Sequence, residues 1–308
     1  MDVRRVPWWL WFTIPIAVLA LAGSVTGLLV DRVYAHETSE WAGEGMGQDV
    51  ANLLVYPLLL VFGLLAVRGS MRARLAWTGL LVYSTYTYAI YVFDVHFGPL
   101  FLLDVAVFGL SVWALVGSLS AVDRASVQER LGRRRARGAE VLLLAVPAMF
   151  ALLWLAEDLP AVLAGTTPDA LDVSGLPTNP VHVLDLSLFL PASFLAGMLL
   201  RRRSAWGSVL APVMLTAMAA IGTGIVSLTI VLGVRGEDAS PVVAVVVGSM
   251  AVVQAVVAWR LLRSVDSERS AQAGGLPAGL GPLLVDAGVH GDPASRAEEP
   301  RPLAGPEQ

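Results

Sequence analysis

His182 and Asp185 are the two residues of this sequence whose types and spacing are best suited to chemistry. They stand three positions apart in an apolar stretch, and residues at that spacing share one face of a helix. A carboxylate beside an imidazole can orient the ring and favour its charged form. Three roles follow and stay open at this stage: a proton relay, a base, or a polar clamp between two helices.

Other polar residues near the ends of apolar stretches are candidates for the same site. Charged groups inside a bilayer are costly, and they usually face a bundle interior or a water-filled cavity. We therefore expect a polar pocket that faces outward. Besides His182 and Asp185, the residues expected to line it are Asn52, Tyr91, Asp94, Asp104, Glu157 and Asn179. The alternative is that these side chains lie close enough to the lipid headgroups to pair there.

Helical spacing gathers several of these residues into stripes. Positions three, four and seven apart lie on one side of a helix, which groups Tyr83, Thr87, Tyr91 and Asp94. The same rule groups His182, Asp185, Phe189 and Ser193, next to a kink expected at Pro191.

Signatures of metal, cofactor and nucleophile chemistry are missing. A metal ion would have to use His182, Asp185, His96 and Asp94, but the H-x-x-x-H spacing of paired ligands does not occur. The chain has no cysteine, and no G-x-S-x-G nucleophile elbow is present. We therefore expect no cofactor, no metal ion and no nucleic acid, with the lipid bilayer and a small solute as partners, and we favour a non-enzymatic role.

The elements that must position these residues are long apolar stretches. Of the 308 residues, 56% are apolar and 15% are charged, and the mean hydropathy is +0.68. A helix needs about 20 mostly apolar residues to cross a bilayer. We predict an all-α, polytopic transmembrane bundle of eight spans at about 7–30, 51–67, 75–95, 99–119, 140–158, 180–200, 206–233 and 242–262.

Arginine is concentrated in alternate gaps between these spans. Cytoplasmic loops of membrane proteins retain an excess of basic residues. The basic set is Arg4, Arg5, Arg68, Arg72, Arg74, Arg124, Arg130, Arg133, Arg134, Arg135, Arg137, Arg201, Arg202, Arg203, Arg260, Arg263 and Arg269. Because the other gaps are acidic or neutral, we predict that both termini lie in the cytoplasm of a bacterial cell, with the spans in its inner membrane. Most tryptophans, including Trp9 and Trp77, fall near the cytoplasmic ends, where such rings favour the headgroup layer.

The chain divides into a transmembrane domain, residues 1–264, and a tail, residues 265–308. The tail holds six prolines (Pro277, Pro282, Pro293, Pro300, Pro302 and Pro306) and many glycines, so we expect it to be disordered in the cytoplasm. Within the domain, the stretch from Asn52 to Tyr83 weakly resembles the stretch from Asp185 onward, with a proline, a glycine, an arginine exit and then Ala-Trp in each. A four-plus-four duplication would relate two such halves by an axis along the membrane normal.

The segment Thr178-Asn179-Pro180-Val181-His182-Val183-Leu184-Asp185 resembles a stretch of an uncharacterised family of multi-pass bacterial membrane proteins, as does Pro99–Leu102 leading to Val107–Ser111. The resemblance covers about half of the chain, and it implies a membrane bundle but no activity. Our leading expectation is a protein that binds or moves a small solute or a proton. A membrane-embedded enzyme that uses His182 and Asp185, or an accessory subunit without pocket chemistry, are the alternatives.

Overall fold

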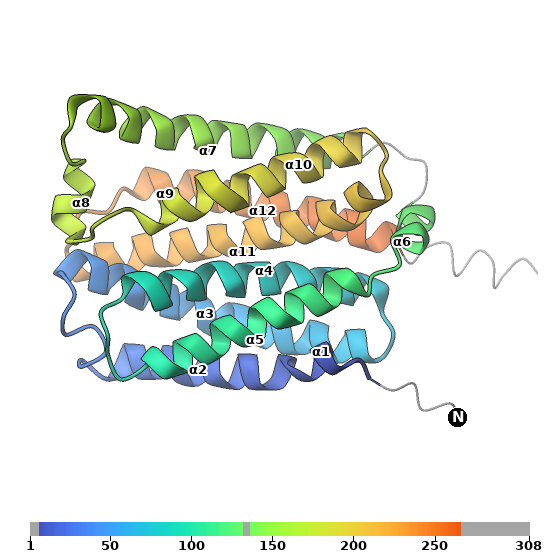
Figure 1. Ribbon diagram of the computed structural model, residues 1–308, viewed down its shortest axis with the longest axis horizontal. Helices are drawn as coiled ribbons and strands as arrows, with labels where there is room; N and C mark the ends of the chain where they lie inside the picture. The colour runs from blue at the N-terminus through green and yellow to red at the C-terminus, as the bar shows by residue number, and fades with distance from the viewer. Residues whose placement is uncertain (1–5, 132–135, 266–308) are drawn as a thin grey trace, which may run out of the picture.

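The computed structural model describes residues 6–131 and 136–265, and within these two ranges it contains helices and no strand. The helices that build the bundle run side by side along one direction (Figure 1). They are α1 (Trp8–Trp11), α2 (Thr13–Leu29), α3 (Ser39–Val67), α4 (Met71–Asp94), α5 (Phe101–Ser120), α7 (Arg137–Ala164), α9 (Pro180–Leu184), the π-helix η1 (Asp185–Phe189), α10 (Leu190–Arg201), α11 (Ala205–Arg235) and α12 (Pro241–Ser264). The short helices α6 (Arg124–Leu131) and α8 (Asp169–Ser174) lie at opposite ends of the bundle.

Seven of the described helical segments are long and apolar enough to cross a membrane. They are Trp8–Leu29, Ser39–Val67, Phe101–Ser120, Arg137–Ala164, Pro180–Arg201, Ala205–Arg235 and Pro241–Ser264. Each overlaps one predicted span. The second begins at Ser39, 12 residues before the predicted residue 51, and the fourth continues to Ala164, beyond the predicted residue 158. These helices fit an integral membrane protein.

The remaining predicted span, 75–95, lies in α4, which is not among the seven. α4 carries Arg72 and Arg74 together with several serines, threonines and tyrosines, and these residues lower its hydropathy. It packs between α3, α5 and α11, so its polar groups find partners on neighbouring helices. One example is the buried chain of hydroxyls from Tyr56 through Ser84 to Ser111, at 2.9 and 2.8 Å. A helix surrounded by protein does not need an apolar surface. This explains why α4 is long enough to cross a membrane but is less apolar than the other seven segments.

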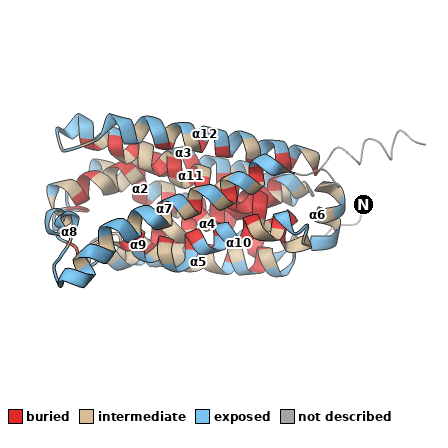
Figure 2. Ribbon diagram, turned by 90° about the horizontal axis from the view of Figure 1, so that it is seen from above, coloured by how far each residue is buried: buried red, intermediate tan, exposed pale blue. Residues whose placement is uncertain are grey.

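The bundle consists of two groups of helices that meet at α11. The first group packs α2 on α3, α3 on α4, α4 on α5 and α5 back on α2, and the second packs α7 on α10, α10 on α11 and α11 on α12. Buried residues gather along the middle of the bundle, whereas the outer faces of α7 and α12 are largely exposed (Figure 2). Apolar side chains such as Leu152 and Val242, each 69% exposed, suit contact with lipid.

Glycines allow α11 to approach both of its partners in the first group. A Cβ added at Gly47 of α3 would lie 2.2 Å from the Leu228 Cα of α11. A Cβ added at Gly79 of α4 would lie 2.5 Å from the Val213 carbonyl oxygen. Small residues at helix contacts are typical of membrane bundles, because they let backbones come close enough for extensive packing.

The turn between α3 and α4 matches the turn between α10 and α11. In the first, the Ser70 N–H donates to the Leu65 carbonyl at 3.1 Å, and in the second the Ser204 N–H donates to the Leu199 carbonyl at 2.9 Å. Gly69 and Arg203, the residues before these serines, have positive φ angles of 89° and 54°. The pairs Pro57–Pro191, Gly63–Gly197 and Ser70–Ser204 are each separated by 134 positions. Trp77 and Trp206 do not follow this spacing, so the likeness between the hairpins extends to their turns but not to the tryptophans.

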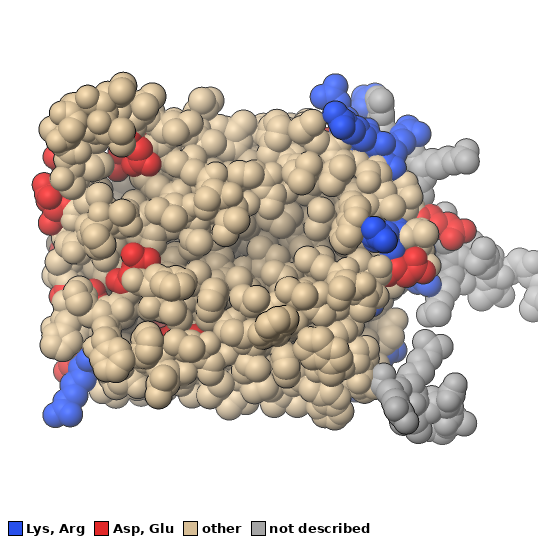
Figure 3. Space-filling view, in the orientation of Figure 1, with Lys and Arg blue, Asp and Glu red and all other residues tan. Residues whose placement is uncertain are grey.

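Arginine is concentrated at one end of the bundle and acidic residues at the other, although Figure 3 also shows acidic atoms at the arginine end and basic atoms at the acidic end. Arg68, Arg124, Arg202 and Arg263 belong to the first end by their positions in the helices and turns. Part of the predicted arginine loop forms α6, while Arg133, Arg134 and Arg135 lie outside the described residues. The predicted disordered tail also lies outside them, apart from Val265.

Trp9 and Trp77 correct one prediction. Both were expected at the headgroup layer, but they are only 4% and 0% exposed. Their ring centroids lie 5.6 Å apart, and the Arg74 guanidinium carbon lies 4.6 Å from the Trp9 ring centroid. These rings therefore stabilise the basic end of the bundle from inside, and an aromatic residue near a helix end is not by itself evidence of a lipid contact.

Candidate functional site

A cavity of about 140 Å³ lies between the two groups of helices. Most of its wall is apolar, and α3, α4, α7, α11 and α12 all contribute lining residues. Its polar and ionisable lining residues are Glu44, Gln48, Tyr83, Tyr86, Thr87, Tyr91, Asp185 and Gln254. The lining begins near the acidic end, at Trp41 and Val95, and continues to Gln254, which at 1.5 Å per residue lies about 20 Å along α12 from Pro241.

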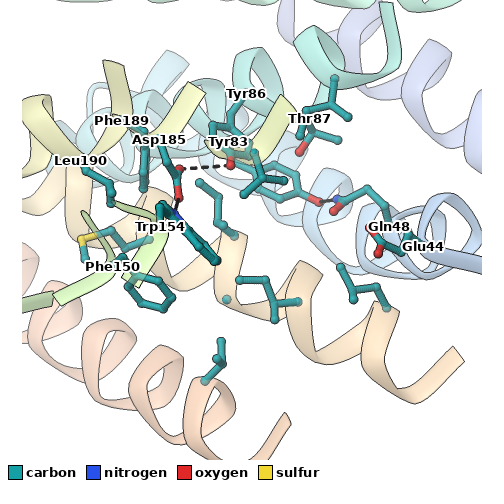
Figure 4. Close-up of a pocket in the computed structure, with 18 of the residues that line it drawn as sticks. Glu44, Gln48, Tyr83, Tyr86, Thr87, Phe150, Trp154, Asp185, Phe189 and Leu190 are labelled. Atoms are coloured by element: carbon teal, nitrogen blue, oxygen red, sulfur yellow. Dashed lines mark hydrogen bonds between the residues drawn. The ribbon is translucent and has the colours of Figure 1, made fainter. Parts of the chain in front are cut away.

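Asp185 is the buried carboxylate of this cavity, at 7% exposure. The Tyr86 hydroxyl donates to its Oδ1 at 3.1 Å, and the Trp154 Nε1–H donates to its Oδ2 at 2.8 Å. Figure 4 shows Asp185 held between these two rings, with Glu44 and Gln48 on the opposite side of the cavity. Both donors are neutral, so they orient the carboxylate without offsetting its charge.

The π-helix places Asp185 in the cavity. Pro191 has no backbone N–H, and its ring would clash with the carbonyl of the residue four positions earlier. Just before Pro191 the backbone hydrogen bonds of the helix change from four to five positions apart, and the Leu190 N–H donates to the Asp185 carbonyl. A π-turn holds one residue more than an α-turn and often occurs at functional sites. The effect that was expected as a kink at Pro191 is thus a local change of helical pitch.

The extra residue also aligns Asp185 with Asn52 in the two similar hairpins. Asn52 stands five positions before Pro57, and Asp185 stands six before Pro191. In the first group Asn52 is fully buried: its Nδ2 donates to Ser24 Oγ at 3.0 Å, and the Tyr83 hydroxyl donates to its Oδ1 at 2.8 Å. Gln48 Nε2 joins this network through Tyr83, at 2.6 Å. Asn52 therefore lies behind the cavity wall, whereas its counterpart Asp185 faces the open space.

His182 pairs with a different carboxylate from the one predicted. Its Nδ1 lies 3.0 Å from Asp158 Oδ1, and its ring stacks on Trp154 with a centroid separation of 4.2 Å. His182 does not line the cavity. Asn179 caps the helix beside it by accepting the Val181 and His182 N–H groups at 3.0 and 3.2 Å. The predicted His182–Asp185 pair is therefore replaced by a row in which Trp154 stands between the two side chains.

A second, smaller cavity of about 20 Å³ lies among α2, α3, α4 and α5. Asp49 and Asp104 both line it. The Tyr34 hydroxyl donates to Asp49 Oδ2 at 2.7 Å, and the Tyr91 hydroxyl donates to Asp49 Oδ1 at 3.0 Å. Burial, followed by the nearby Asp49, raises the pKa of Tyr34, a loop residue, well above its usual value, so its phenol remains a donor. Tyr91 and Val95 line both cavities, so the two cavities are adjacent.

The predicted site residues are therefore distributed over several environments. Asp185 and Tyr91 line the large cavity, and Asp104 lines the small one. The Asp94 backbone carbonyl accepts the Trp41 indole N–H at 3.2 Å, but Asp94 lines neither cavity. Glu157 is exposed on α7.

The four residues considered as metal ligands do not converge. His96 Nδ1 lies 3.0 Å from Glu37 Oε2, far from the Asp158 partner of His182 in sequence and in the fold. Across residues 6–131 and 136–265, no group of three or more histidine, cysteine or acidic side chains is arranged to hold a metal ion.

Several lining residues were missed at the sequence level. Glu44 and Asp49 were assigned to an acidic gap because the second span was taken to begin at residue 51. The Thr38 hydroxyl, which accepts the Trp41 N–H at 3.3 Å, is the N-cap signal that could have placed this start earlier. Tyr86, Trp154 and Gln254 carry no local signal, because only the packing of distant helices brings them to one cavity.

Comparisons with protein-family models, with curated protein sequences and with solved structures found no match to this chain.

Proposed function

We propose that this chain binds a small solute in the large cavity and carries it across a bacterial inner membrane. The observation that supports the proposal is that a few polar side chains stand in the otherwise apolar wall of that cavity. Asp185, Glu44 and Gln254 meet there in a wall that is otherwise mostly apolar. Sites for small molecules combine an apolar wall with a few placed polar groups in this way.

We propose an orientation with eight spans, α4 included, and both termini in the cytoplasm. The concentration of arginine at one end of the bundle supports this orientation through the positive-inside rule. In it, the acidic end faces outward, and the cavity lining near Trp41 and Val95 lies at the outer surface. The π-turn η1 inside the helix Pro180–Arg201 supports a functional role for Asp185, since such turns often occur at functional sites.

The proposal is tested with purified protein in proteoliposomes, using uptake of a panel of anionic, neutral and cationic solutes. We expect uptake of at least one class, lost in Asp185→Asn and retained in Glu157→Gln. Glu157 is the matched control, because it is an acidic residue near the same end of the bundle but exposed on α7. Uptake that is absent for all classes, or equal in both variants, would contradict the proposal.

Proton movement is a second candidate, which the small cavity favours. Asp49 and Asp104 share that cavity, which is adjacent to the large one. Chains of carboxylates are typical of proton pathways in membrane proteins. Acidification of a dye-loaded proteoliposome interior on solute addition, lost in Asp104→Asn, would support a coupled proton.

The remaining alternatives are distinguished by the same samples. A membrane-embedded enzyme would turn over a substrate in detergent without any gradient. His182 lies behind Trp154 and outside the cavity lining, which makes it poorly placed as a base for a cavity-bound substrate. An accessory subunit would show altered stability or partner capture in Asp185→Asn, with no solute bound.

A further inference from the structure

The large cavity is acidic, and the protein does not neutralise its charge. Glu44 and Asp185 line it, and no arginine or histidine does so among the residues that the structure describes. Glu44 has no hydrogen-bond or ion-pair partner in that part of the chain. The two donors to Asp185, Tyr86 and Trp154, are neutral. His182 stacks on Trp154, but it is paired with Asp158 and stays outside the lining.

Aromatic rings surround the carboxylate of Asp185. Tyr86 and Phe189 meet edge to face with centroids 5.5 Å apart, and Phe150 and Trp154 lie 5.7 Å apart. Figure 4 shows these side chains grouped around Asp185. The negative face of an aromatic ring attracts cations, and organic ammonium groups in particular are bound by aromatic cages. The aromatic rings and the Asp185 carboxylate therefore both favour a positively charged occupant.

Gln254 supplies an independent sign that the cavity holds a ligand. Its side chain is 4% exposed, it lines the cavity from α12, and it makes no hydrogen bond within the described chain. Buried amides are nearly always paired, and an unpaired one calls for an explanation. An occupant with a polar group, or one that brings water with it, would provide the missing partner, whereas a pure hydrocarbon would not.

We propose that the occupant is a small amphiphilic organic cation: an ammonium group beside Asp185 that carries an aromatic or branched hydrocarbon group. The hydrocarbon part would contact Met218, Ile221 and Ile225 of the apolar wall. The volume of about 140 Å³ is suitable, because an apolar cavity of about 150 Å³ accommodates a molecule the size of benzene. The proposal rests on the solute-binding function above and names its substrate class.

A bare metal cation fits the same cavity less well. Hard divalent cations require six or more oxygen ligands for Ca²⁺, or near-octahedral coordination for Mg²⁺. The described residues form no cluster of three or more suitable side chains, and the wall around the two carboxylates is mainly apolar. An organic cation satisfies both features, because it presents charge to Asp185 and hydrocarbon to the wall.

The test uses two probes of the same shape. Neopentylammonium and 2,2-dimethylbutane are both about the size of benzene, and they differ in that an ammonium group replaces a methyl group. Binding of each to the full chain in detergent is measured by calorimetry or tryptophan fluorescence. We expect the cation to bind more tightly, and Asp185→Asn to weaken its binding by between about tenfold and about a thousandfold, the range for loss of one close charge at intermediate dielectric. 2,2-Dimethylbutane should bind equally to the wild type and to Asp185→Asn, which shows that the cavity stays folded.

Glu157→Gln is the control for charge removal away from the cavity, and it should leave the affinity for both probes unchanged. Equal affinity of the wild type for the two probes would overturn the cation proposal and leave solute binding intact. The cation proposal would also be overturned if Asp185→Asn did not change the preference for the charged probe over the neutral one. Failure of both probes to bind wild-type protein that takes up another solute class would also overturn only the substrate class. Failure of both, together with absent uptake of every class, would overturn the proposed function itself.

Discussion

Gly47 is the position where a single methyl group should disturb the bundle most clearly. A Cβ at Gly47 would lie 2.2 Å from the Leu228 Cα and 2.7 Å from its Cβ, whereas carbon atoms pack best at about 3.5–4.0 Å. Leu228 belongs to α11 and lines the large cavity. To accept Gly47→Ala, α3 and α11 must therefore separate by more than about 1 Å along a contact that contains backbone.

Overpacking of this kind costs about 1–3 kcal/mol. The matched control is Gly109→Ala in α5, where an added Cβ meets no atom within 4 Å. That variant should gain up to about 1 kcal/mol, because alanine is the better helix former. Because the same propensity gain applies at Gly47 in α3, it cancels in the comparison, and the two alanine variants should differ by about 1–3 kcal/mol in free energy of unfolding.

The difference can be measured by denaturant titration in detergent micelles, followed by tryptophan fluorescence. Equal stability of Gly47→Ala and wild type would show that the close approach of α3 and α11 is wrong. Equal destabilisation by Gly109→Ala would show that alanine acts through something other than this contact.

Three further outcomes are expected. Tyr34→Phe removes a 2.7 Å hydrogen bond to Asp49 and should lower the free energy of unfolding by about 1.5–3 kcal/mol near neutral pH. Because folding raises the pKa of Tyr34, its contribution to stability is fully present below about pH 10 and is lost at higher pH. The free energy of unfolding of the variant should therefore fall less between pH 9 and 11 than that of the wild type. Trp154→Phe keeps the ring beside His182 but removes the 2.8 Å donor to Asp185, and it should cost about 1–3 kcal/mol by the same titration, whereas Trp113→Phe, at a 60% exposed site, should cost little. Since the chain has no cysteine, Thr166→Cys should react with an impermeant maleimide on intact cells and Ala125→Cys only after permeabilisation; the reverse pattern would contradict the orientation.

Long apolar stretches made the helical bundle predictable, because a run of about 20 such residues has few other uses. Boundaries were harder to predict. Glu44, Gln48 and Asp49 lie within α3, yet their polarity resembles that of a loop. A helix can carry such residues when neighbouring helices or a cavity receive them, and this depends on packing that the local sequence does not encode. α4 illustrates the same effect along a whole element.

Sequence reasoning singled out individual polar residues of the cavities, but it did not identify the side chains that contact them. Asp185, Tyr91 and Asp104 do line cavities, because an acidic or phenolic group inside an apolar stretch needs a polar environment. Their partners came from elsewhere: Tyr86 and Trp154 reach Asp185 across 99 and 31 positions. His182 and Asp185 lie three positions apart in helical backbone, but each bonds to another partner: His182 to Asp158, and Asp185 to Tyr86 and Trp154.

Access to Thr87 from the outer surface would decide whether the acidic, aromatic cavity is an outward-facing site for cations. Thr87 lines the cavity and is 4% exposed, and Thr87→Cys would be the only thiol of the chain. Membrane-impermeant cationic and anionic methanethiosulfonates of similar size are applied to right-side-out and inside-out vesicles. We expect the cationic reagent to modify Cys at this position faster than the anionic one, and from the outer side only. Modification should be slower when neopentylammonium is present. Modification from the inner side alone would contradict the orientation. Faster modification by the anionic reagent would contradict the charge of the cavity.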